Sequence, residues 1–489
     1  MDVELKSRLE GKAKCLGHDL TSQEFALAMD AEDPLRSFRN LFHFPKRINI
    51  PEANGDVTES SRDPVYFSGM SLGLCPTTTK DLVCSSLDDW ANLGVHGHTT
   101  GIFPWAEADL CVDEQMAALV GAKREEVAVM NGLSVNLHLF LLSFYQPTPS
   151  RHKILCESRA FPSDYYIIES QIQHRGFQPA TSMICVQPKS GEEWIDEGEI
   201  LRVIEEEGES IAVILLGGVQ YYTGQLFDMA AITAAAQRKG IIVGFDLAHA
   251  VGNVPLHLHD WNVDFACWCT YKYLNSGAGG IACAYMHERH NATVKPALQG
   301  WWGHKSETRF DMDNEMDLEE GVRGFRLTNP SILMCASLKA SLNIYHQTSL
   351  EELRNKSIML TGYLEWLIRH YFSSNSPGFS SQSTIRILTP PQPERRGCQL
   401  SLCFSIPLSD IYEKLSLAGV SCDKREPSVI RIAPVHLYNS FEDVYKFVEI
   451  LRGILYHMTV FGHMIKFNSG HFTYDIGVYY SDKTIKETC

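Results

Sequence analysis

The sequence predicts an α/β protein, with a large domain whose mainly parallel sheet is covered by helices and a smaller C-terminal α/β domain. Short β-branched runs alternate with helix-like stretches through the middle of the chain, a pattern typical of a parallel sheet with helices on both faces. After Asn329-Pro330 a long helical pattern precedes a Ser- and Pro-rich stretch and a further set of short elements. At 489 residues, the chain is also longer than one ordinary domain.

The elements of the middle region are expected in alternation. Apolar and β-branched runs predict a short strand at 127–130 and further strands at 153–158, 183–187, 211–216 and 241–246. Helical patterns between them predict helices at 163–173, 197–207 and 229–239. Ser163 is the expected N-cap of the first of these helices, and Gly240 ends the third.

The C-terminal part is predicted to form a second α/β unit. One long helical pattern covers 331–371, and the later elements are expected as strands at 384–388, 399–406 and 429–433 and helices at 409–417 and 441–455. The expected division is an N-terminal helical segment (1–60) that could pack on either domain, a large domain (61–330), a small domain (331–456) and a divergent tail (457–489).

Charge and composition exclude several classes of function. Forty-three basic against fifty-nine acidic residues give a net charge of −16, and no basic patch interrupts this background, so we expect no nucleic-acid or acidic-membrane partner. The N-terminus lacks the features of a secretion signal and no stretch is apolar enough to span a membrane, which predicts a cytoplasmic protein. Fourteen cysteines without a CxxC pair predict reduced thiols.

No metal site is expected from the sequence. The nearest approach to a metal motif is the pair His287 and His290, which are three residues apart. A four-residue spacing is the one that places two histidine ligands on one helical face. A solvated helix or loop is therefore the favoured interpretation of this stretch.

An acid and a lysine carry the clearest chemical signal. Asp246 is expected at the carboxyl end of a buried parallel strand. Ligands of open α/β sheets bind just beyond the carboxyl ends of the strands. Lys272 follows an apolar stretch and precedes small residues, and a lysine withdrawn from water can act as an amine nucleophile. Pyridoxal phosphate requires such a pair, a lysine for its aldehyde and a carboxylate for its ring nitrogen, although many α/β proteins contain both residues without the cofactor.

Two further segments fit the same cofactor. Ser134 follows Gly132 at the start of an apolar helix, where a hydroxyl and free backbone N–H groups could hold a phosphate, or simply cap the helix. Phe161 and Asp164 lie just past a strand, so they offer an aromatic face and a second carboxylate to a planar ring. A capping segment explains that second pair nearly as well.

Taken together, these segments resemble the kynureninase family, pyridoxal-phosphate enzymes of the aspartate-aminotransferase fold type I. The resemblance runs in order from about residue 60 to 450. Its matching blocks begin at Tyr66, Ser71, Gly97, Asn131, Ala160, Tyr222, Phe245, Thr270, Gly300, Thr328 and Cys422. The sequence departs from the family pattern at Met70, in place of an asparagine, at Trp302, in place of a smaller aromatic residue, and in the tail after about Leu455.

The resemblance implies a role for each matched residue. Lys272 is similar to the Schiff-base lysine, Asp246 to the acid on the ring nitrogen, and Tyr271 to a proton-transferring group. The implied cofactor-binding residues are Leu133, Ser134, Phe161, Ser163, Asp164, Asp246, His249, Tyr271, Lys272, Trp301 and Asn329. The implied substrate-binding residues are Ser71, His98, Trp302, Thr328 and Arg431. In this family Trp301 and Asn329 reach the cofactor from the neighbouring subunit, so the resemblance implies a homodimer with shared sites.

The implied reaction is hydrolysis of the Cβ–Cγ bond of L-kynurenine or 3-hydroxy-L-kynurenine. The products are L-alanine and anthranilate or 3-hydroxyanthranilate, in tryptophan catabolism toward NAD. Two alternatives stay open at this point: a cysteine or selenocysteine lyase of the same fold, which would need a mobile catalytic thiol, and a binding paralogue that has lost turnover.

Overall fold

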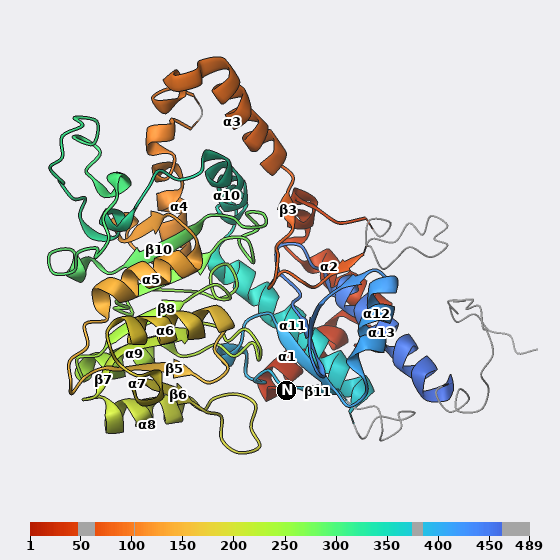
Figure 1. Cartoon of the computed structure of the whole chain (residues 1–489). Helices are drawn as coiled ribbons and strands as arrows, with labels where there is room; N and C mark the ends of the chain where they lie inside the picture. Colours follow the sequence, from red (N-terminus) through yellow and green to blue (C-terminus); the bar gives the residue numbers. More distant parts are fainter. Residues whose placement is uncertain (47–63, 102, 374–384, 462–489) are drawn as a thin grey trace, which may run out of the picture.

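The larger of two units is built on a seven-stranded sheet (Figure 1). The computed structural model describes residues 1–46, 64–101, 103–373 and 385–461. In spatial order the strands are β4 (Val127–Val129), β10 (Ala282–Met286), β9 (Phe265–Cys269), β8 (Ile242–Asp246), β7 (Ile211–Gly217), β5 (Lys153–Glu157) and β6 (Met183–Val186). In this sheet β10 runs opposite to the other six strands, so the prediction of a mainly parallel sheet is confirmed.

Alternate residues of the central strands enter two different cores. Ile214 and Leu216 of β7 belong to one hydrophobic cluster, whereas Val213 and Leu215 belong to the other. Because successive side chains of a strand point to opposite faces, each face of the sheet has its own apolar layer. The first layer contains α4 (Leu110–Val120), α8 (Glu197–Glu207), α9 (Met229–Arg238) and α10 (Ile332–Tyr345), and the second contains α5 (Leu133–Phe144) and α6 (Pro162–His174).

The smaller unit contains a four-stranded antiparallel sheet. Its order is β11 (Ile385–Ile387), β12 (Leu400–Phe404), β15 (Val429–Ile432) and β14 (Asp423–Arg425). The helices α11 (Leu350–Phe372), α12 (Leu408–Leu417) and α13 (Phe441–Phe461) share one core with this sheet. Further elements of the described residues include α3 (Thr79–Leu93), α7 (Pro179–Ser182), β1 (Phe42–His43), β2 (Val65–Tyr66), β3 (Cys75–Pro76) and β13 (Val420–Ser421).

The N-terminal helices pack on the smaller unit, a choice that the sequence left open. Leu9 of α1 (Val3–Leu16) and Phe25 of α2 (Gln23–Glu32) are buried in the core that α11 and α13 line. Residues 47–60 of the expected N-terminal segment, and 462–489 of the expected divergent tail, lie outside the described residues. The domain boundaries stay a prediction.

Three expectations about helices were wrong. The pattern at 331–371 is two helices, α10 and α11, because the Ser349 hydroxyl and the Glu352 carboxylate form a capping box that starts a new helix. Helix α13 continues past 455 to Phe461. Helix α6 begins at Pro162, so Ser163 lies within its first turn and does not cap it.

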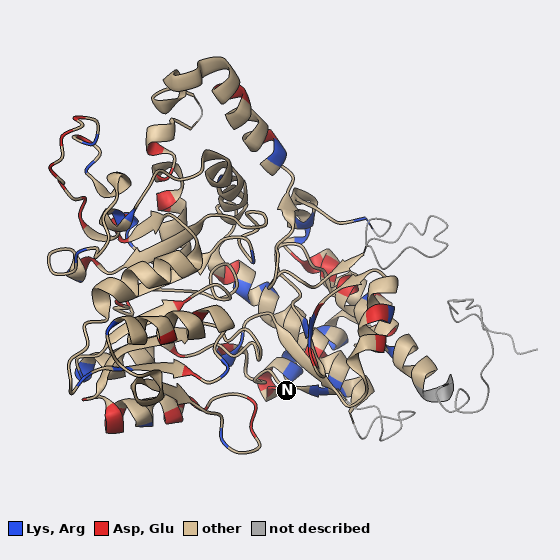
Figure 2. Ribbon diagram, in the orientation of Figure 1, with Lys and Arg blue, Asp and Glu red and all other residues tan. Residues whose placement is uncertain are grey.

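Charged groups of both signs are interspersed over the two units (Figure 2). Helix α8 is an acidic element, with Glu205, Glu206 and Glu207 in its last turn. Over residues 1–46, 64–101, 103–373 and 385–461, the helices include none with the length and apolar composition that a membrane crossing requires.

Candidate active site

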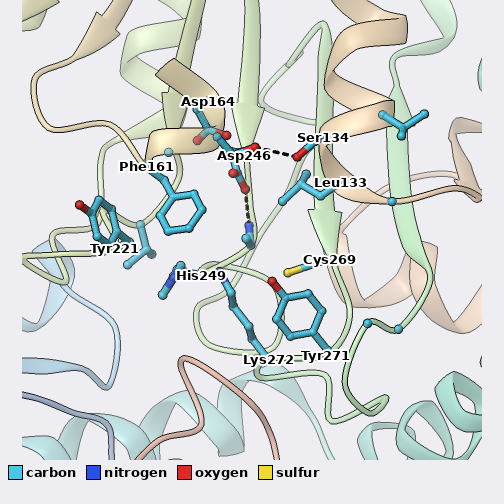
Figure 3. A pocket seen from close by; sticks show the side chains of 18 of the residues that line it. Leu133, Ser134, Phe161, Asp164, Tyr221, Asp246, His249, Cys269, Tyr271 and Lys272 are labelled. Carbon is cyan, nitrogen blue, oxygen red and sulfur yellow. Dashed lines mark hydrogen bonds between the residues drawn. The ribbon is translucent and has the colours of Figure 1, made fainter. Parts of the chain in front are cut away.

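A cavity of about 300 Å³ opens at the carboxyl ends of β5, β7, β8 and β9 (Figure 3). Parallel strands bring their carboxyl ends to one edge of a sheet, and this is where α/β proteins bind ligands. The sequence-predicted residues that line the cavity are Leu133, Ser134, Phe161, Ser163, Asp164, Asp246, His249, Tyr271 and Lys272.

Three buried acids lie on one side of the cavity. Asp246 ends β8, and its Oδ1 accepts the Ala248 N–H at 2.7 Å. Burial raises the pKa of Asp246, and burial together with the charge of Asp246 raises the pKa of neighbouring Asp164 well above its usual value. Glu157 ends β5 and accepts the Gly217 N–H at 3.3 Å, and burial raises its pKa to about 7. Such a cluster favours a cationic partner, because a positive charge relieves the repulsion among the acids.

Lys272 lies across the cavity from these acids, in the turn after β9 (Figure 3). Its Nζ is 5.7 Å from the ring centroid of Phe161 and 5.9 Å from that of Tyr271. Backbone hydrogen bonds fix the turn: the Gly73 N–H donates to the Tyr271 carbonyl at 2.9 Å, and the Asn275 N–H donates to the Lys272 carbonyl at 3.0 Å. The amine therefore projects from a rigid backbone into the same space as the carboxylates.

Hydroxyl groups gather at the start of α5. The Oγ atoms of Ser134 and Ser163 are 2.7 Å apart, which joins the first turns of α5 and α6. The N-cap of α5 is Gly132, which has no side chain to cap the first turn, and Gly132, Leu133, Ser134 and Val135 all line the cavity. A helix N-terminus of this kind favours an anion.

The implied substrate-binding residues and two of the implied cofactor-binding residues, Trp301 and Asn329, do not line the cavity of this chain. The exposed ones among them are Ser71, His98, Trp301, Thr328 and Asn329. Trp302 is buried with the Arg309 guanidinium 4.1 Å from its ring centroid. Arg431 does not line the cavity but contacts Tyr221, which does. Its Nη1 donates to the Tyr221 carbonyl at 2.7 Å, and its Nε donates to Asp423 at 2.8 Å.

Comparison with known proteins decides the family. The chain is 52% identical to kynureninase of Mus musculus over 93% of its own length and 97% of the relative, and 51% identical to kynureninase of Homo sapiens over 92% and 96%. The chain belongs to the kynureninase family. Residues 353–451 match the model of the kynureninase C-terminal domain, and residues 112–381 match that of class-V aminotransferases.

The kynureninase fold assignment has independent support from a solved structure. A mutant of C-DES with glycine covalently linked to its PLP cofactor superposes with a TM-score of 0.66 at 15% identity, over 83% of this chain and 99% of that chain. At that identity the likeness concerns the fold alone, and it confirms the predicted fold type.

One departure from the kynureninase pattern lies away from the cavity. Met70 is fully buried in the core of the larger unit and does not line the cavity. The thioether therefore occupies a packing position, where a flexible apolar side chain is well suited.

Among the titratable side chains that line this cavity, sequence reasoning missed three: Glu157, Tyr221 and Cys269. Glu157 ends a predicted strand, so the rule that identified Asp246 could have found it too. Cys269 precedes the lysine turn, and burial raises the pKa of its thiol to about 11. Tyr221 carried no signal, because its contact with Arg431 joins distant parts of the chain.

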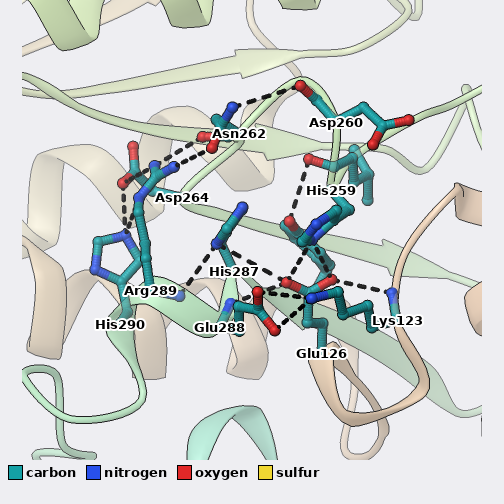
Figure 4. A network of polar contacts seen from close by, with 12 residues as sticks. Lys123, Glu126, His259, Asp260, Asn262, Asp264, His287, Glu288, Arg289 and His290 are labelled. Atoms are coloured by element: carbon teal, nitrogen blue, oxygen red, sulfur yellow. Dashed lines mark hydrogen bonds and ion pairs between the residues drawn. The ribbon is translucent and has the colours of Figure 1, made fainter.

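The two histidines of the 287–290 stretch face different carboxylates (Figure 4). The Nε2 of His290 is 2.6 Å from Asp264, whereas the Nδ1 of His287 is 3.9 Å from Glu126. Ligand atoms of Glu126, His259 and His287 lie within 4.8 Å of one another, a grouping that the spacing rule did not find.

The group formed by Glu126, His259 and His287 connects separate turns of the chain through hydrogen bonds to Glu126. The Glu126 carboxylate accepts the N–H groups of Lys123 and Glu288 at 3.0 and 2.9 Å. The rings of His259 and His287 stack at 15°. The lone pair of a histidine nitrogen lies in the plane of its ring. The planes of these two stacked rings are nearly parallel, so their lone pairs do not converge on one ion.

Proposed function

We propose that this cavity binds pyridoxal 5′-phosphate and that the chain acts as a kynureninase, a pyridoxal-phosphate-dependent hydrolase. It cleaves the Cβ–Cγ bond of L-kynurenine, 3-hydroxy-L-kynurenine or both, and releases L-alanine with anthranilate or 3-hydroxyanthranilate. The reaction belongs to tryptophan catabolism toward NAD. The observation that carries the proposal is that Lys272 and Asp246 face one cavity beside the ring of Phe161.

The residues present fit this cofactor. Asp246 would hold the protonated ring nitrogen, Phe161 would stack on the ring, and Ser134 and Ser163 would hold the phosphate at the α5 N-terminus. Within the described part of the chain, the buried Nδ1 of His249 has no hydrogen-bond partner, as expected of a group that awaits a ligand. Leu133 and Asp164 complete the cofactor contacts.

The bound cofactor supplies an electron sink for charge that develops at the substrate α-carbon. Lys272 Nζ would hold the cofactor's aldehyde and, as a free amine, would accept the substrate's α-proton and give it back during the reaction. Asp246 would keep the ring nitrogen of the cofactor protonated. Burial raises the pKa of Tyr271, so its hydroxyl stays protonated and can donate a proton at a later step.

A second copy of the chain completes the substrate side in this proposal. Arg431 binds the substrate carboxylate through its planar guanidinium. Trp301 and Asn329 are solvent-exposed here, and in a homodimer they reach the cofactor of the neighbouring subunit. The further substrate contacts are Ser71, His98, Trp302 and Thr328. We also propose that the enzyme is cytoplasmic and, on the basis of its acidic charge, that it has no nucleic-acid partner.

The cofactor assignment is tested by borohydride reduction of the purified protein. We expect a yellow protein that loses its colour on reduction, with the cofactor fixed to the peptide that contains Lys272. Lys272→Ala abolishes the label, whereas Lys295→Ala, at an exposed lysine of the same unit, retains it. A protein that never takes up the cofactor contradicts the proposal.

The reaction is tested by measuring alanine and anthranilate released from kynurenine against sulfide released from cysteine. The lyase alternative needs a reactive thiol, but the raised pKa of the cavity thiol of Cys269 keeps it protonated. We therefore expect anthranilate release to dominate. Dominant sulfide release indicates the lyase, and cofactor binding without either product indicates the inactive paralogue.

A further inference from the structure

Two cysteines lie side by side at the edge of the large sheet. Cys156 of β5 pairs in register with Cys185 of β6, and their Sγ atoms are 3.6 Å apart. β6 is the last strand of the seven-stranded sheet, so it is hydrogen-bonded to the sheet along one side. Cys156 is buried, whereas Cys185 is partly exposed.

We propose that Cys156 and Cys185 form an oxidation site that hydrogen peroxide converts to an intrachain disulfide. The Cys185 thiolate attacks one peroxide oxygen, the O–O bond breaks, and a sulfenic acid and hydroxide form. The Cys156 sulfur then attacks the Cys185 sulfur, an S–S bond replaces the S–O bond, and the departing hydroxide takes the Cys156 proton. Overall, two thiols and one peroxide give one disulfide and two waters.

The geometry favours formation of a disulfide between Cys156 and Cys185. Neighbouring strands lie about 4.7–4.9 Å apart, within the separation of about 4.4–6.8 Å between Cα atoms that disulfides span. The sulfurs must approach from 3.6 Å to about 2.05 Å, and an edge strand can shift because hydrogen bonds hold it along one side.

The two thiols are suited to different steps. The hydrogen bond between them lowers the pKa of Cys185 to about 7 and raises that of Cys156 well above its usual value. Near neutral pH, Cys185 is therefore the thiolate that meets the oxidant, and Cys156 is the protonated partner that resolves the sulfenic acid.

Closure of the pair reaches the candidate active site through one residue. Glu157 directly follows Cys156 on β5, and its carboxylate lines the cavity and accepts the Gly217 N–H. Although the edge strand β6 can make most of the approach, the new S–S bond also pulls on Cys156 of β5, and this pull displaces the adjacent Glu157 carboxylate from the acid cluster. Oxidation therefore lowers turnover, and reduction of the disulfide restores it.

Peptide mapping of the full-length holoenzyme tests the site independently of its catalytic function. After peroxide treatment and alkylation of free thiols, trypsin releases residues 154–159 and 176–189, which carry Cys156 and Cys185. We expect a disulfide-linked pair of these peptides that dithiothreitol separates. In Cys156→Ser, Cys185 stops at the sulfenic acid and reacts with dimedone. Both peptides recovered alkylated and unlinked after peroxide treatment, or linked to other cysteines, overturn the proposal.

Activity measurements test the coupling. We expect peroxide to lower the kcat of the wild-type enzyme at least about threefold and dithiothreitol to restore it, with no such loss in Cys185→Ser. Cys403→Ser is the matched control, because Cys403 is also a partly exposed strand cysteine but contacts the Ser428 hydroxyl instead of a second thiol. Full activity in a protein with the mapped disulfide overturns the coupling to Glu157 while the oxidation site stands.

Discussion

The part of the proposed site inside the cavity, its cofactor end, and the part outside the cavity, its outer end, differ in how completely one chain builds them. At the cofactor end, the lysine, the acids and the hydroxyl groups all line a single cavity. At the outer end, the proposed substrate residue His98 and the proposed cofactor residues Trp301 and Asn329 lie on exposed surface. Strand ends and the starts of two helices, α5 and α6, organise the first set, whereas the second set stands on loops and short turns.

The difference shows which part of the chemistry the fold itself organises. A parallel sheet brings its strand ends together whatever else the chain does, so a lysine and a carboxylate at those ends meet without a partner. Residues on surface loops have no such constraint, and a site formed by them can be completed by a second copy of the chain. The predictions that follow separate the two ends.

Subunit mixing is expected to give the largest effect. Lys272→Ala and Asn329→Ala should each abolish or strongly reduce turnover, the first by about 10³-fold or more because it removes the nucleophile and base. Coexpressing the two variants with different tags should recover about one quarter of wild-type activity, because random pairing leaves one intact site in half of the dimers.

The control for mixing combines two variants of the cofactor end. Lys272→Ala with Asp246→Asn should recover nothing, because both residues line the cavity of one chain. Recovery in this control, or none with Asn329→Ala, contradicts the division of the site between subunits.

Arg431 joins the two ends, and its replacement should affect substrate binding. Arg431→Lys removes the planar donor pair held by Asp423 and the Tyr221 carbonyl, so the KM for kynurenine should rise about 10- to 150-fold, as expected for a loss of about 1.5–3 kcal/mol. Steady-state kinetics on the holoenzyme provide the measurement. Arg425→Lys, a half-exposed neighbour on the same carboxylate, should change KM less than about threefold. Equal effects of both substitutions on KM would contradict the proposal that Arg431 binds the substrate carboxylate.

The buried Glu157 carboxyl should lower the stability of the folded protein as the pH rises and the carboxyl ionises. Its pKa is about 7 in the folded chain against 4.5 ordinarily, so the folded state holds a proton that the unfolded state has released. The free energy of unfolding therefore falls between pH 4.5 and about 7, by at most about 3 kcal/mol. Glu157→Gln should lack this loss and should be more stable than the wild type at pH 8 but not at pH 4.5.

Urea unfolding across this pH range measures the effect. Glu209→Gln, at a side chain that is 88% exposed, should follow the wild-type pH dependence. A Glu157→Gln variant with the wild-type pH dependence means that Glu157 is ionised at no cost in the folded protein.

Sequence reasoning identified residues that line the cavity more readily than contacts outside it, for a physical reason. Asp246 and Lys272 carry local signals, because a buried strand precedes the acid and an apolar stretch precedes the lysine. The elements at 197–207 and 229–239 were similarly predictable from apolar spacing. The break between α10 and α11 depends on one capping box within a continuous apolar pattern, which periodicity alone does not resolve.

Contacts between distant segments account for most of what was missed. The hydrogen bond from Arg431 to the Tyr221 carbonyl joins residues 210 positions apart. The pairing of Cys156 with Cys185 depends on the register of two strands, which a single-residue slip would change. Such pairings follow from the topology, and sequence periodicity does not encode them.

Ser163 should give the smallest effect, and it tests the part of the cofactor end that depends on neutral groups. Ser163→Ala removes one member of the Ser134–Ser163 hydroxyl pair without changing charge. A neutral hydrogen bond contributes about 0.5–1.5 kcal/mol, so the Kd for pyridoxal phosphate should rise about 2- to 10-fold in titrations of cofactor-free protein. Ser170→Ala is the control on the same helix, because its hydroxyl donates to the Ile167 carbonyl. An unchanged Kd in Ser163→Ala would leave phosphate binding to Ser134 and the α5 backbone, since the helix N-terminus attracts an anion without any side chain.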